Sequence, residues 1–355
     1  MDREQTTAAY LLDQCARYPA LELQDLLKAL YQSVFGCGHL LTEKAAERLR
    51  AELAALPRQA SGEVEPLDGP FRRVHLGYLK ESGLSEKTLF RLFALSAETP
   101  GGGPGELEEK LAVLCSLAEA GRLPFPPGET AEAVAAWRRA GFPACHHSNA
   151  FRAAYAPAYR VVRKDLAWAL PLLAAIDRRL AEGGRLLLAI DGGSASGKTT
   201  LGTLLARVYD CHVFHMDDFF LRPCQRTAER LAEPGGNVDR ERFLDEVLLP
   251  LSRGEMVRYR RYDCHTQTLE AAVEVLPRKL NVVEGAYSLH PALAGYYGLT
   301  AFLRIPPAVQ RVRILARNGT GVGERFFTQW IPLEERYFAA LDPAGRCDVI
   351  LEVEE

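Results

Sequence analysis

The sequence predicts two consecutive domains, a mainly α-helical domain at residues 1–180 and an α/β domain with a parallel sheet at residues 181–355. Helical spacing of apolar residues in the first half supports the first domain. Apolar runs without alternation, and a glycine-rich loop between one such run and a helix, support the second. At 355 residues the chain is long enough for two domains, and its 48% hydrophobic and 25% charged residues are ordinary for a globular protein.

Apolar residues three and four positions apart, bounded by capping residues, predict a series of amphipathic helices in the first half. One apolar stripe runs through Leu26, Leu30 and Val34 and ends at Gly36, and another follows the N-cap residue Ser85. Stripes of the same spacing lie within 45–56, 107–117, 134–137 and 165–180. These segments are the expected helices of the first domain.

The second half alternates between apolar runs and helical segments, which is the pattern of a layered α/β fold. The first run, Arg185–Ile190, follows Gly183 and Gly184 and has no polar alternation, as expected for a strand buried on both faces of a parallel sheet. Similar runs lie at Cys211–Met216, Leu280–Val283, Thr300–Ile305 and Cys347–Val353. We therefore expect about five parallel strands and a domain boundary near residue 180.

Charge and cysteine usage narrow the range of partners. The formal net charge of −3 gives no overall attraction to nucleic acid or to anionic lipid. The N-terminus lacks the basic start and apolar run of a signal peptide, and no apolar stretch is long enough to cross a bilayer. Eight scattered cysteines in such a chain favour reduced thiols. We expect a cytoplasmic protein with no nucleic-acid or membrane partner, either a monomer or a homodimer.

The strongest motif is Gly192-Gly193-Ser194-Ala195-Ser196-Gly197-Lys198-Thr199, which fits the P-loop pattern G-x-x-x-x-G-K-[ST]. Glycines allow a tight turn that points successive N–H groups at phosphate oxygens, and the following helix adds its positive end. Lys198 would neutralise the β- and γ-phosphates, the Thr199 hydroxyl would ligate Mg²⁺, and Thr200 continues the phosphate-binding turn. The motif follows an apolar run and precedes a helical stripe, so we expect a P-loop NTPase domain that binds ATP and Mg²⁺.

Acidic and basic residues beyond the loop suggest a reaction. Asp217 and Asp218 follow a strand where an α/β sheet binds its ligands, and one of them could accept a proton from an attacking hydroxyl. Glu284 ends a later strand, a position from which a carboxylate reaches Mg²⁺. Arg313 and Arg317 share a helix face, and they precede the glycine-bearing stretch Gly319–Gly323 and Arg325, which is typical of a mobile cationic lid.

The segment 185–355 resembles the uridine kinase superfamily, which includes nicotinamide riboside kinases, pantothenate kinases and phosphoribulokinases. The matching pieces, in order, are GGSASGKTT, MDDFFLRP, EPGGNVDRERF, YRRYDCHTQTL, VVEGAYSLHP and RILARNG. At two positions where uridine kinases hold the pyrimidine with Phe and His, this chain has Cys264 and Gln267. The lid carries Arg317-Asn318 where the family usually has Arg-Asp. The resemblance therefore implies the chemistry more firmly than the substrate.

The resemblance also implies residue roles. Asp217 matches the catalytic base, Lys198 and Thr199 the P-loop residues, Glu284 a Mg²⁺ carboxylate together with Thr199 and Asp217, and Arg317 a catalytic lid arginine. Arg313 and Arg325 are further candidates for contacts with the ATP phosphates. The residues that match the family's acceptor-binding stretches are Asp218, Arg222, Asp239 and Tyr262.

These features predict an ATP-dependent kinase that transfers the γ-phosphate to a hydroxyl of a small molecule, either a nucleoside or a sugar-like alcohol. The alternative is an ATP-binding regulatory module, in which the P-loop domain switches the helical domain's binding to a partner. A catalytic carboxylate beside an acceptor site favours the kinase, because a switch requires neither.

The first domain contains three polar groups whose role stays open. They are Phe35–His39, Arg72–His75, and Ala144–Ser148 with Tyr155, Tyr159, Arg160 and Arg163. One hypothesis is a metal site that uses Cys37, His39, Cys145 and either His146 or His147. A second is a pocket for an anion or sugar phosphate, and a third is that the residues cap helices, satisfy buried polar groups or line an interface.

Overall fold

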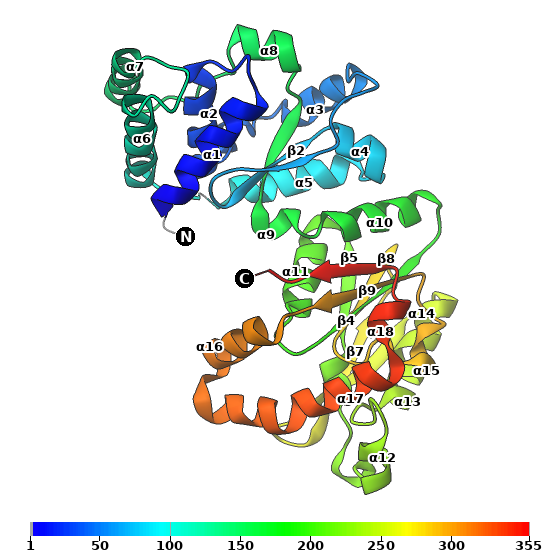
Figure 1. Ribbon diagram of the computed structural model, residues 1–355. Helices are drawn as coiled ribbons and strands as arrows, with labels where there is room; N and C mark the ends of the chain where they lie inside the picture. Colours follow the sequence, from blue (N-terminus) through cyan, green and yellow to red (C-terminus); the bar gives the residue numbers. More distant parts are fainter. Residues whose placement is uncertain (1–2, 100, 355) are drawn as a thin grey trace. The chain divides into compact units, whose positions relative to one another are not determined.

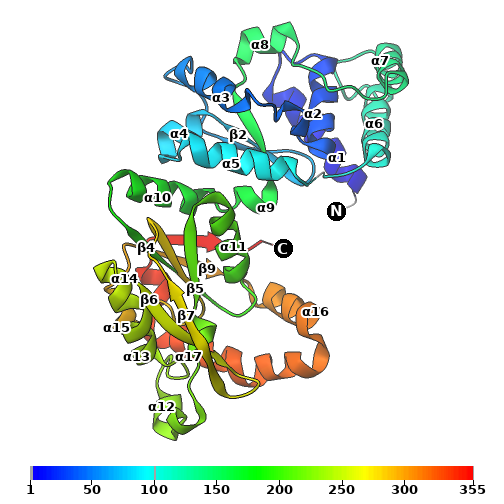
Figure 2. The same ribbon diagram turned by 180° about the vertical axis from the view of Figure 1, so that it is seen from behind.

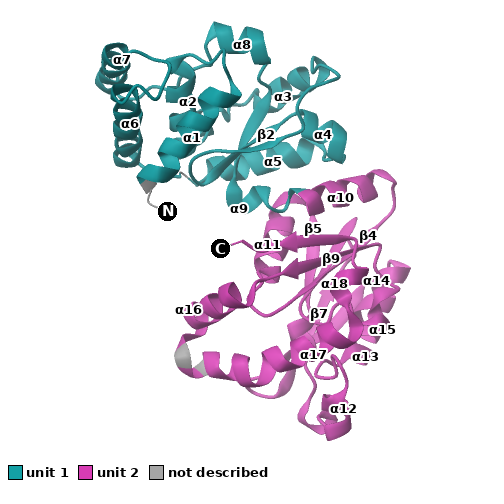
Figure 3. Cartoon of the chain, viewed as in Figure 1, with its two compact units in different colours: residues 1–170 teal, residues 171–355 magenta. Residues whose placement is uncertain are grey.

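The computed structural model describes residues 3–99 and 101–354 (Figure 1). The chain forms two compact units, residues 1–170 and 171–355 (Figure 3). The first unit is mainly helical, as predicted. Its elements are α1 (Arg3–Arg17), α2 (Leu23–Phe35), η1 (Gly38–Leu40), α3 (Ala45–Ala54), β1 (Val64–Pro66), β2 (Phe71–His75), α4 (Gly77–Ser82), α5 (Glu86–Ala97), α6 (Pro104–Glu119), α7 (Pro127–Arg139), α8 (Asn149–Tyr155), β3 (Tyr159–Arg163) and α9 (Lys164–Ala167).

The core of the first unit lies among α1, α2, α6, α7 and α8. The apolar stripe of α2 points into it, with Leu26, Leu30 and Val34 fully buried, and α6 contributes a matching stripe. Ser85 caps α5 by accepting a hydrogen bond from the backbone N–H of Thr88, as its sequence position predicted. Burying each large aliphatic side chain contributes about 1.5–3 kcal/mol, so these stripes hold the helices together.

The first unit also contains an antiparallel sheet, in the order β1-β2-β3, that the sequence pattern did not predict. Glu65 pairs with Arg73 and His75 pairs with Tyr159 across its strands, which places these four side chains on one face. Charged residues that are buried on a strand break the alternation of apolar and polar residues by which strands are recognised, so these strands carry no clear sequence signal.

The second unit is an α/β fold. Its elements are α10 (Leu170–Ala181), β4 (Leu186–Gly192), α11 (Lys198–Val208), β5 (Cys211–His215), η2 (Met216–Phe219), η3 (Pro223–Gln225), α12 (Ala228–Ala232), α13 (Arg240–Phe243), η4 (Leu244–Leu248), α14 (Leu249–Arg253), β6 (Val257–Asp263), β7 (Thr268–Val275), β8 (Leu280–Glu284), α15 (Pro291–Ala294), β9 (Leu299–Arg304), α16 (Pro307–Arg325), η5 (Phe326–Trp330), α17 (Ile331–Leu341), α18 (Pro343–Arg346) and β10 (Val349–Glu352).

The five predicted strand segments form one parallel sheet in the order β10-β9-β4-β8-β5, and β4, the strand before the P-loop, is central. Figure 2 shows the sheet from behind, with helices around it. Four residues of the inner strands β4 and β8 are fully buried, namely Leu188, Ile190, Val282 and Val283. The unbroken apolar runs therefore reflect burial on both faces, and the carboxyl ends of β4, β5 and β8 meet at one edge.

The two compact units divide at residue 170, before the boundary expected near residue 180, so that α10 lies almost entirely in the second unit. The expected helix over 165–180 is interrupted at Trp168 and Ala169, which lie between α9 and α10. The hydroxyl of Tyr209, at the end of α11, contacts the carbonyl of Leu173 and the carboxylate of Asp177, which ties α10 to the second unit. The Gly183–Gly184 pair is the turn between α10 and β4 rather than a linker.

The second unit contains a hairpin that was not predicted and a kink in its glycine-bearing stretch. Strands β6 and β7 form a separate antiparallel hairpin, and β7 contains no buried residue that would mark it as a strand in the sequence. Helix α16 is kinked at Gly319, whose φ of 69° interrupts the helical backbone. A positive φ of this size is accessible to glycine without steric cost, so the kink lies inside the glycine-bearing stretch where a hinge was expected.

Candidate nucleotide-binding site

The P-loop joins the carboxyl end of β4 to the first turn of α11. Gly192 and Gly197 adopt φ of 146° and 100°, and Ala195 adopts 60°. A Cβ atom at position 192 would lie 2.6 Å from the carbonyl oxygen of Leu303, so only glycine fits there. The glycines of the motif are thus required by the backbone path, which turns the loop around the N-terminus of α11 and forms an anion cradle.

Lys198 folds back over the loop. Its Nζ atom donates hydrogen bonds to the carbonyl oxygens of Gly192 and Gly193, at 2.8 and 2.9 Å. The Oγ atom of Ser196 is buried inside the loop and has no hydrogen-bond partner among the described residues. A cradle with an ammonium group at its rim and an unpaired hydroxyl inside it matches the chemistry of a nucleotide's phosphates.

Two residues far along the chain clamp the loop at Ser194. The Glu334 carboxylate on α17 accepts hydrogen bonds from the backbone N–H and the hydroxyl of Ser194, at 2.9 and 2.6 Å. The side-chain amide of Gln310, on α16, donates to the Ser194 carbonyl oxygen at 2.9 Å. Burial raises the pKa of Glu334, while Lys198 and the bonds from Ser194 oppose that rise. Sequence reasoning missed both residues, because nothing local to α16 or α17 marks them.

Asp191, directly before the loop, is a buried junction. Its carboxylate accepts hydrogen bonds from the backbone N–H groups of Gly192, Tyr287 and Leu289, and from the hydroxyl of Tyr337 at 2.8 Å. Burial raises the pKa of Asp191, and the hydrogen bonds partly offset it. Because Tyr337 and Glu334 lie one turn apart on α17, this helix holds both the base and the tip of the P-loop.

A hydroxyl, a carboxylate and an imidazole meet beside the loop. Thr199 donates from Oγ1 to Oε1 of Glu284 at 3.0 Å, and Nδ1 of His215 lies 2.5 Å from the same oxygen. The hydrogen bond to Glu284 raises the pKa of His215, which burial opposes. Thr199 and Glu284 offer the hard oxygen ligands that Mg²⁺ prefers, and Mg²⁺ sites use few protein ligands, so the two residues fit this ion. His215 was not predicted as a site residue.

Asp217 lies on η2 at the carboxyl end of β5, with its side chain open to solvent. Desolvation of the Asp217 carboxyl group by the surrounding protein raises its pKa. Lys198 lowers this pKa, and the nearby Glu284 carboxylate raises it further. Arg317 also lowers the pKa of Asp217. The structure thus gathers Asp217, Lys198, Glu284 and Arg317 into one electrostatic environment at the edge of the sheet.

The predicted acceptor residues lie next to this edge, and several bind each other. Asp239 is buried, caps α13 through the N–H of Arg242 and accepts a hydrogen bond from Gln225 at 2.8 Å. The guanidinium of Arg222 donates to the same Gln225 side chain. Gln225 therefore links Asp239 to Arg222, a connection that the sequence did not reveal.

The remaining acceptor residues, Asp218 and Tyr262, face the hairpin. Tyr262 on β6 is buried, and its hydroxyl accepts a hydrogen bond from Arg226 at 3.2 Å. The Asp218 carboxylate lies 3.5 Å from Nε of Arg261, in an ion pair, and burial raises its pKa. One carboxylate oxygen of Asp218 has no hydrogen-bond partner among the described residues.

The lid arginines do not act as one group. Arg317 is exposed and its guanidinium lies 5.5 Å from the ring centre of Phe326, on the far side of the kink. Arg313 donates instead to the carbonyl oxygen of Glu354 near the end of the chain. Arg325 is exposed at the end of α16. Arg317 lowers the pKa of the Asp217 carboxylate, so it lies within electrostatic reach of that group.

The metal hypothesis for the first unit is not supported. The described residues contain no group of three or more Cys, His, Asp or Glu side chains that could hold a metal ion. His147 is engaged at both ring nitrogens, by Asp25 and Tyr159, and His39 packs its ring against Tyr31. The structure does bring Arg73, His75, Tyr155 and Tyr159 together around one cavity.

The second unit has the fold of a P-loop NTPase, a parallel sheet whose central strand leads into the glycine-rich loop. No family model matches this chain. It is similar to a possible uridine kinase from Bacillus stearothermophilus (21% identity, 53% of this chain and 99% of that one, TM-score 0.42). It is also similar to a protein assigned as a fructose transport system kinase from Silicibacter sp. TM1040 (25%, 52% and 97%, 0.42) and to shikimate kinase from Bacteroides thetaiotaomicron (16%, 47% and 86%, 0.26).

No helix within residues 3–99 and 101–354 is both long enough and apolar enough to cross a bilayer.

Proposed function

We propose that the second unit is an ATP-dependent kinase that phosphorylates a hydroxyl group of a small molecule, with a nucleoside or a sugar-like alcohol as the acceptor class. The observation that carries the proposal is the meeting of a P-loop with Asp217, Glu284 and His215 at one edge of the sheet. A phosphate cradle alone would suit any nucleotide-binding protein. A carboxylate beside it, with Lys198 nearby, adds a group that can receive the proton of an attacking alcohol.

In the proposed reaction the acceptor oxygen attacks the γ-phosphorus of ATP and its proton passes to Asp217. The bond between the γ-phosphorus and the oxygen that bridges it to the β-phosphate breaks, so ADP leaves with that electron pair. The raised pKa of Asp217 suits a proton acceptor, since a carboxylate at its ordinary pKa is a weaker base. Lys198 and Arg317 supply positive charge where the phosphoryl oxygens develop negative charge.

Mg²⁺ bound at Thr199 and Glu284 would neutralise phosphate charge and orient the donor. His215 shares an oxygen of Glu284, so its protonated form fixes the orientation of this carboxylate. Asp239, Arg222 and Gln225 form the linked polar group that we assign to the acceptor hydroxyls. Because neighbouring protein groups already hold these side chains, the acceptor would meet a preformed set of donors and acceptors.

The test is ADP release by the full chain with Mg²⁺ and ATP, across a panel of nucleosides, sugars and vitamins with free hydroxyls. We expect one class of acceptor to stimulate release. Asp217→Asn should lower kcat/KM by at least about 100-fold while ATP binding persists, because removing a general base costs about 10²–10⁴-fold. Asp218→Asn, at the neighbouring carboxylate, is the matched comparison and should cost less.

Two results would count against the kinase. Near-normal turnover by Asp217→Asn would remove the base assignment. Tight ATP binding without stimulation by any acceptor would instead favour the regulatory alternative, in which nucleotide occupancy changes what the first unit binds.

A further inference from the structure

The first unit contains a cavity of about 470 Å³, within the range of about 300–1,000 Å³ typical of small-molecule sites. One face of the β1-β2-β3 sheet forms its floor through Glu65, Arg73, His75 and Tyr159. The end of α1, the loop over residues 56–61, helix α8 and the loop over residues 156–158 form the walls. All of these segments belong to the first unit, so the cavity is separate from the P-loop site.

The floor is a buried ionic network. Arg73 and Glu65 are 2% and 1% exposed, and Nη1 of Arg73 lies 3.2 Å from Oε1 of Glu65. Gln14 donates to Oε1 of Glu65, and Nε2 of His75 lies 3.2 Å from Oε2. Burial alone would raise the pKa of Glu65, but His75 and Arg73 outweigh it and lower that pKa to about 2. Burying such charges is costly unless they are paired, and this network pairs them, so the floor of the cavity is a fixed polar surface.

The wall of the cavity is aromatic. Tyr18, Phe151 and Tyr155 pack against one another with ring centres 4.8–5.2 Å apart. Tyr159 joins them from the floor, with the Arg73 guanidinium 4.9 Å from its ring centre. Flat apolar faces beside a polar floor favour a ligand that is itself a ring with polar edges.

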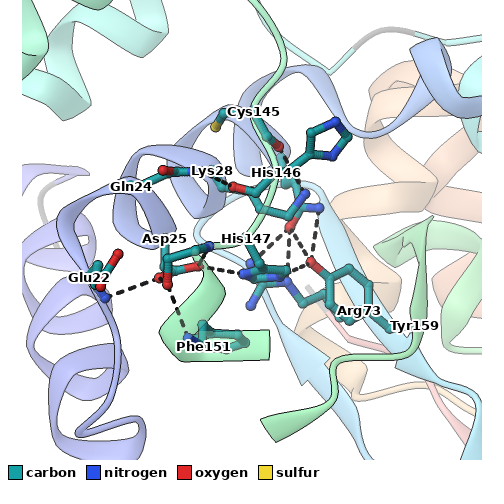
Figure 4. Close-up of polar contacts among 12 residues, drawn as sticks. Glu22, Gln24, Asp25, Lys28, Arg73, Cys145, His146, His147, Phe151 and Tyr159 are labelled. Carbon is teal, nitrogen blue, oxygen red and sulfur yellow. Dashed lines mark hydrogen bonds and ion pairs between the residues drawn. The ribbon is translucent and has the colours of Figure 1, made fainter. Parts of the chain in front are cut away.

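A second layer of residues holds these rings in place. The Asp25 carboxylate accepts a hydrogen bond from Nδ1 of His147, whose Nε2 accepts one from the Tyr159 hydroxyl, at 2.7 and 2.6 Å; Figure 4 shows His147 between the other two. Burial lowers the pKa of His147 to about 4, so it is neutral and this direction of donation follows. The His147 ring also stacks on Phe151 at 4.3 Å. The rings of the cavity are therefore preorganised, which reduces the entropy that binding must overcome.

Several polar atoms of the lining remain for a ligand. Nε2 of His75 faces the Glu65 carboxylate, so its other ring nitrogen, Nδ1, remains for a ligand. The Tyr155 hydroxyl accepts from the backbone N–H of Ala20, and the Ser61 hydroxyl accepts from that of Glu63, which leaves both protons to be donated. Within the described part of the chain, neither proton has an acceptor. The cavity thus offers both donors and acceptors.

The charges that line the cavity cancel. Its two arginines, Arg17 and Arg73, are each paired with a glutamate of the lining, Glu63 and Glu65. A phosphate would have to approach these carboxylates, and separating Arg73 from Glu65, the buried one of the two pairs, costs about 3–5 kcal/mol. This balance argues against the anion pocket that the His, Tyr and Arg residues suggested in the sequence.

We propose that this cavity binds an uncharged polar ring compound, of the nucleoside or sugar class, as a second small-molecule site in the chain. The aromatic wall covers the face of the ring, and His75, Tyr155 and Ser61 bind its polar edge. The inference goes beyond the proposed kinase activity and does not depend on it, since no residue of the cavity belongs to the P-loop unit.

The test uses two variants on α8. Ala153 and Ala154 are both exposed, but only Ala154 lines the cavity, so Ala154→Trp places an indole at the cavity and Ala153→Trp is the matched control. The probes are uridine, adenosine, ribose and glucose, each with its monophosphate, titrated calorimetrically into the full chain carrying Lys198→Ala. We expect an unphosphorylated probe to bind, and Ala154→Trp to weaken that binding at least about tenfold while Ala153→Trp does not.

Binding that Ala154→Trp leaves unchanged would place the ligand elsewhere and overturn the site. Absence of saturable binding by every probe would also overturn it. Tighter binding of the monophosphates in the Ala153→Trp chain would contradict the uncharged class. The ratio of the affinities for nucleosides and for sugars identifies which of these two classes the cavity binds. Circular dichroism on both variants checks that the added indole leaves the helical unit folded.

Discussion

Tyr337→Phe tests whether α17 stabilises the base of the P-loop. The tyrosine is fully buried, and its hydroxyl donates to the Asp191 carboxylate at 2.8 Å. Phenylalanine keeps the ring and removes that bond, so the three backbone N–H donors to Asp191 remain. A hydrogen bond to a charged group contributes about 1.5–3 kcal/mol, and we expect this loss in the free energy of unfolding of the second unit.

The expected change in melting temperature follows from the size of that unit. The second unit spans residues 171–355, and for domains of about 150–250 residues each kcal/mol shifts the melting temperature by about 2–4 °C. The variant should therefore melt about 3–12 °C lower, measured by calorimetry on the full chain. The transition of the second unit is recognised as the one that ATP and Mg²⁺ shift upward.

Tyr297→Phe is the control. The Tyr297 hydroxyl is also buried and has no hydrogen-bond partner among the described residues. Removing an unpaired buried hydroxyl relieves its desolvation cost, so this variant should be as stable as the parent or more stable. Equal melting temperatures for Tyr337→Phe and the parent chain would refute the reasoning, as would equal losses in the two variants.

Three further predictions concern charge. Lys198→Ala should lower kcat/KM for phosphoryl transfer at least about 100-fold, while circular dichroism shows an unchanged fold. The acid limb of the kcat/KM profile should have its midpoint above 3.8, because the pKa of Asp217 is raised and its protonated form accepts no proton; a midpoint at or below that value would contradict the base assignment. Glu65 stabilises the first unit above its ordinary pKa of 4.5, and this contribution should fade as the pH falls toward about 2; in Glu65→Gln, urea unfolding should lose that pH dependence.

The parts of the second unit that the sequence predicted are those fixed by neighbours in the chain. The P-loop needs glycine at particular positions because its backbone path is set within eight residues, and Gly192 and Gly197 meet that need locally. The strands were visible because a parallel strand buried on both faces is apolar throughout. Such signals depend on no distant contact.

The unpredicted site residues depend on which strands and helices become neighbours. His215 faces Glu284 because β5 pairs directly with β8 and the two residues are opposite each other in the register. Without the strand order, a histidine that ends a strand has no distinguishing mark. Glu334 lies 140 positions from Ser194, and its role appears only when α17 returns to the loop. Contacts of this kind are set by tertiary packing and have no local pattern.

Buried polar atoms without a protein partner bear on what the P-loop site binds. Around the P-loop, the Ser196 hydroxyl and one Asp218 oxygen are buried without a hydrogen-bond partner among the described residues. Unpaired groups of this kind cost free energy in the protein alone and are satisfied when a charged substrate supplies the partner. Around the first unit's cavity, Glu65, Arg73 and His147 are hydrogen-bonded by protein groups, whereas the buried Tyr10 hydroxyl has no such partner among the described residues. Unpaired buried groups therefore occur in both units. In the P-loop unit, a bound phosphate would satisfy the Ser196 hydroxyl, which supports the proposed nucleotide site.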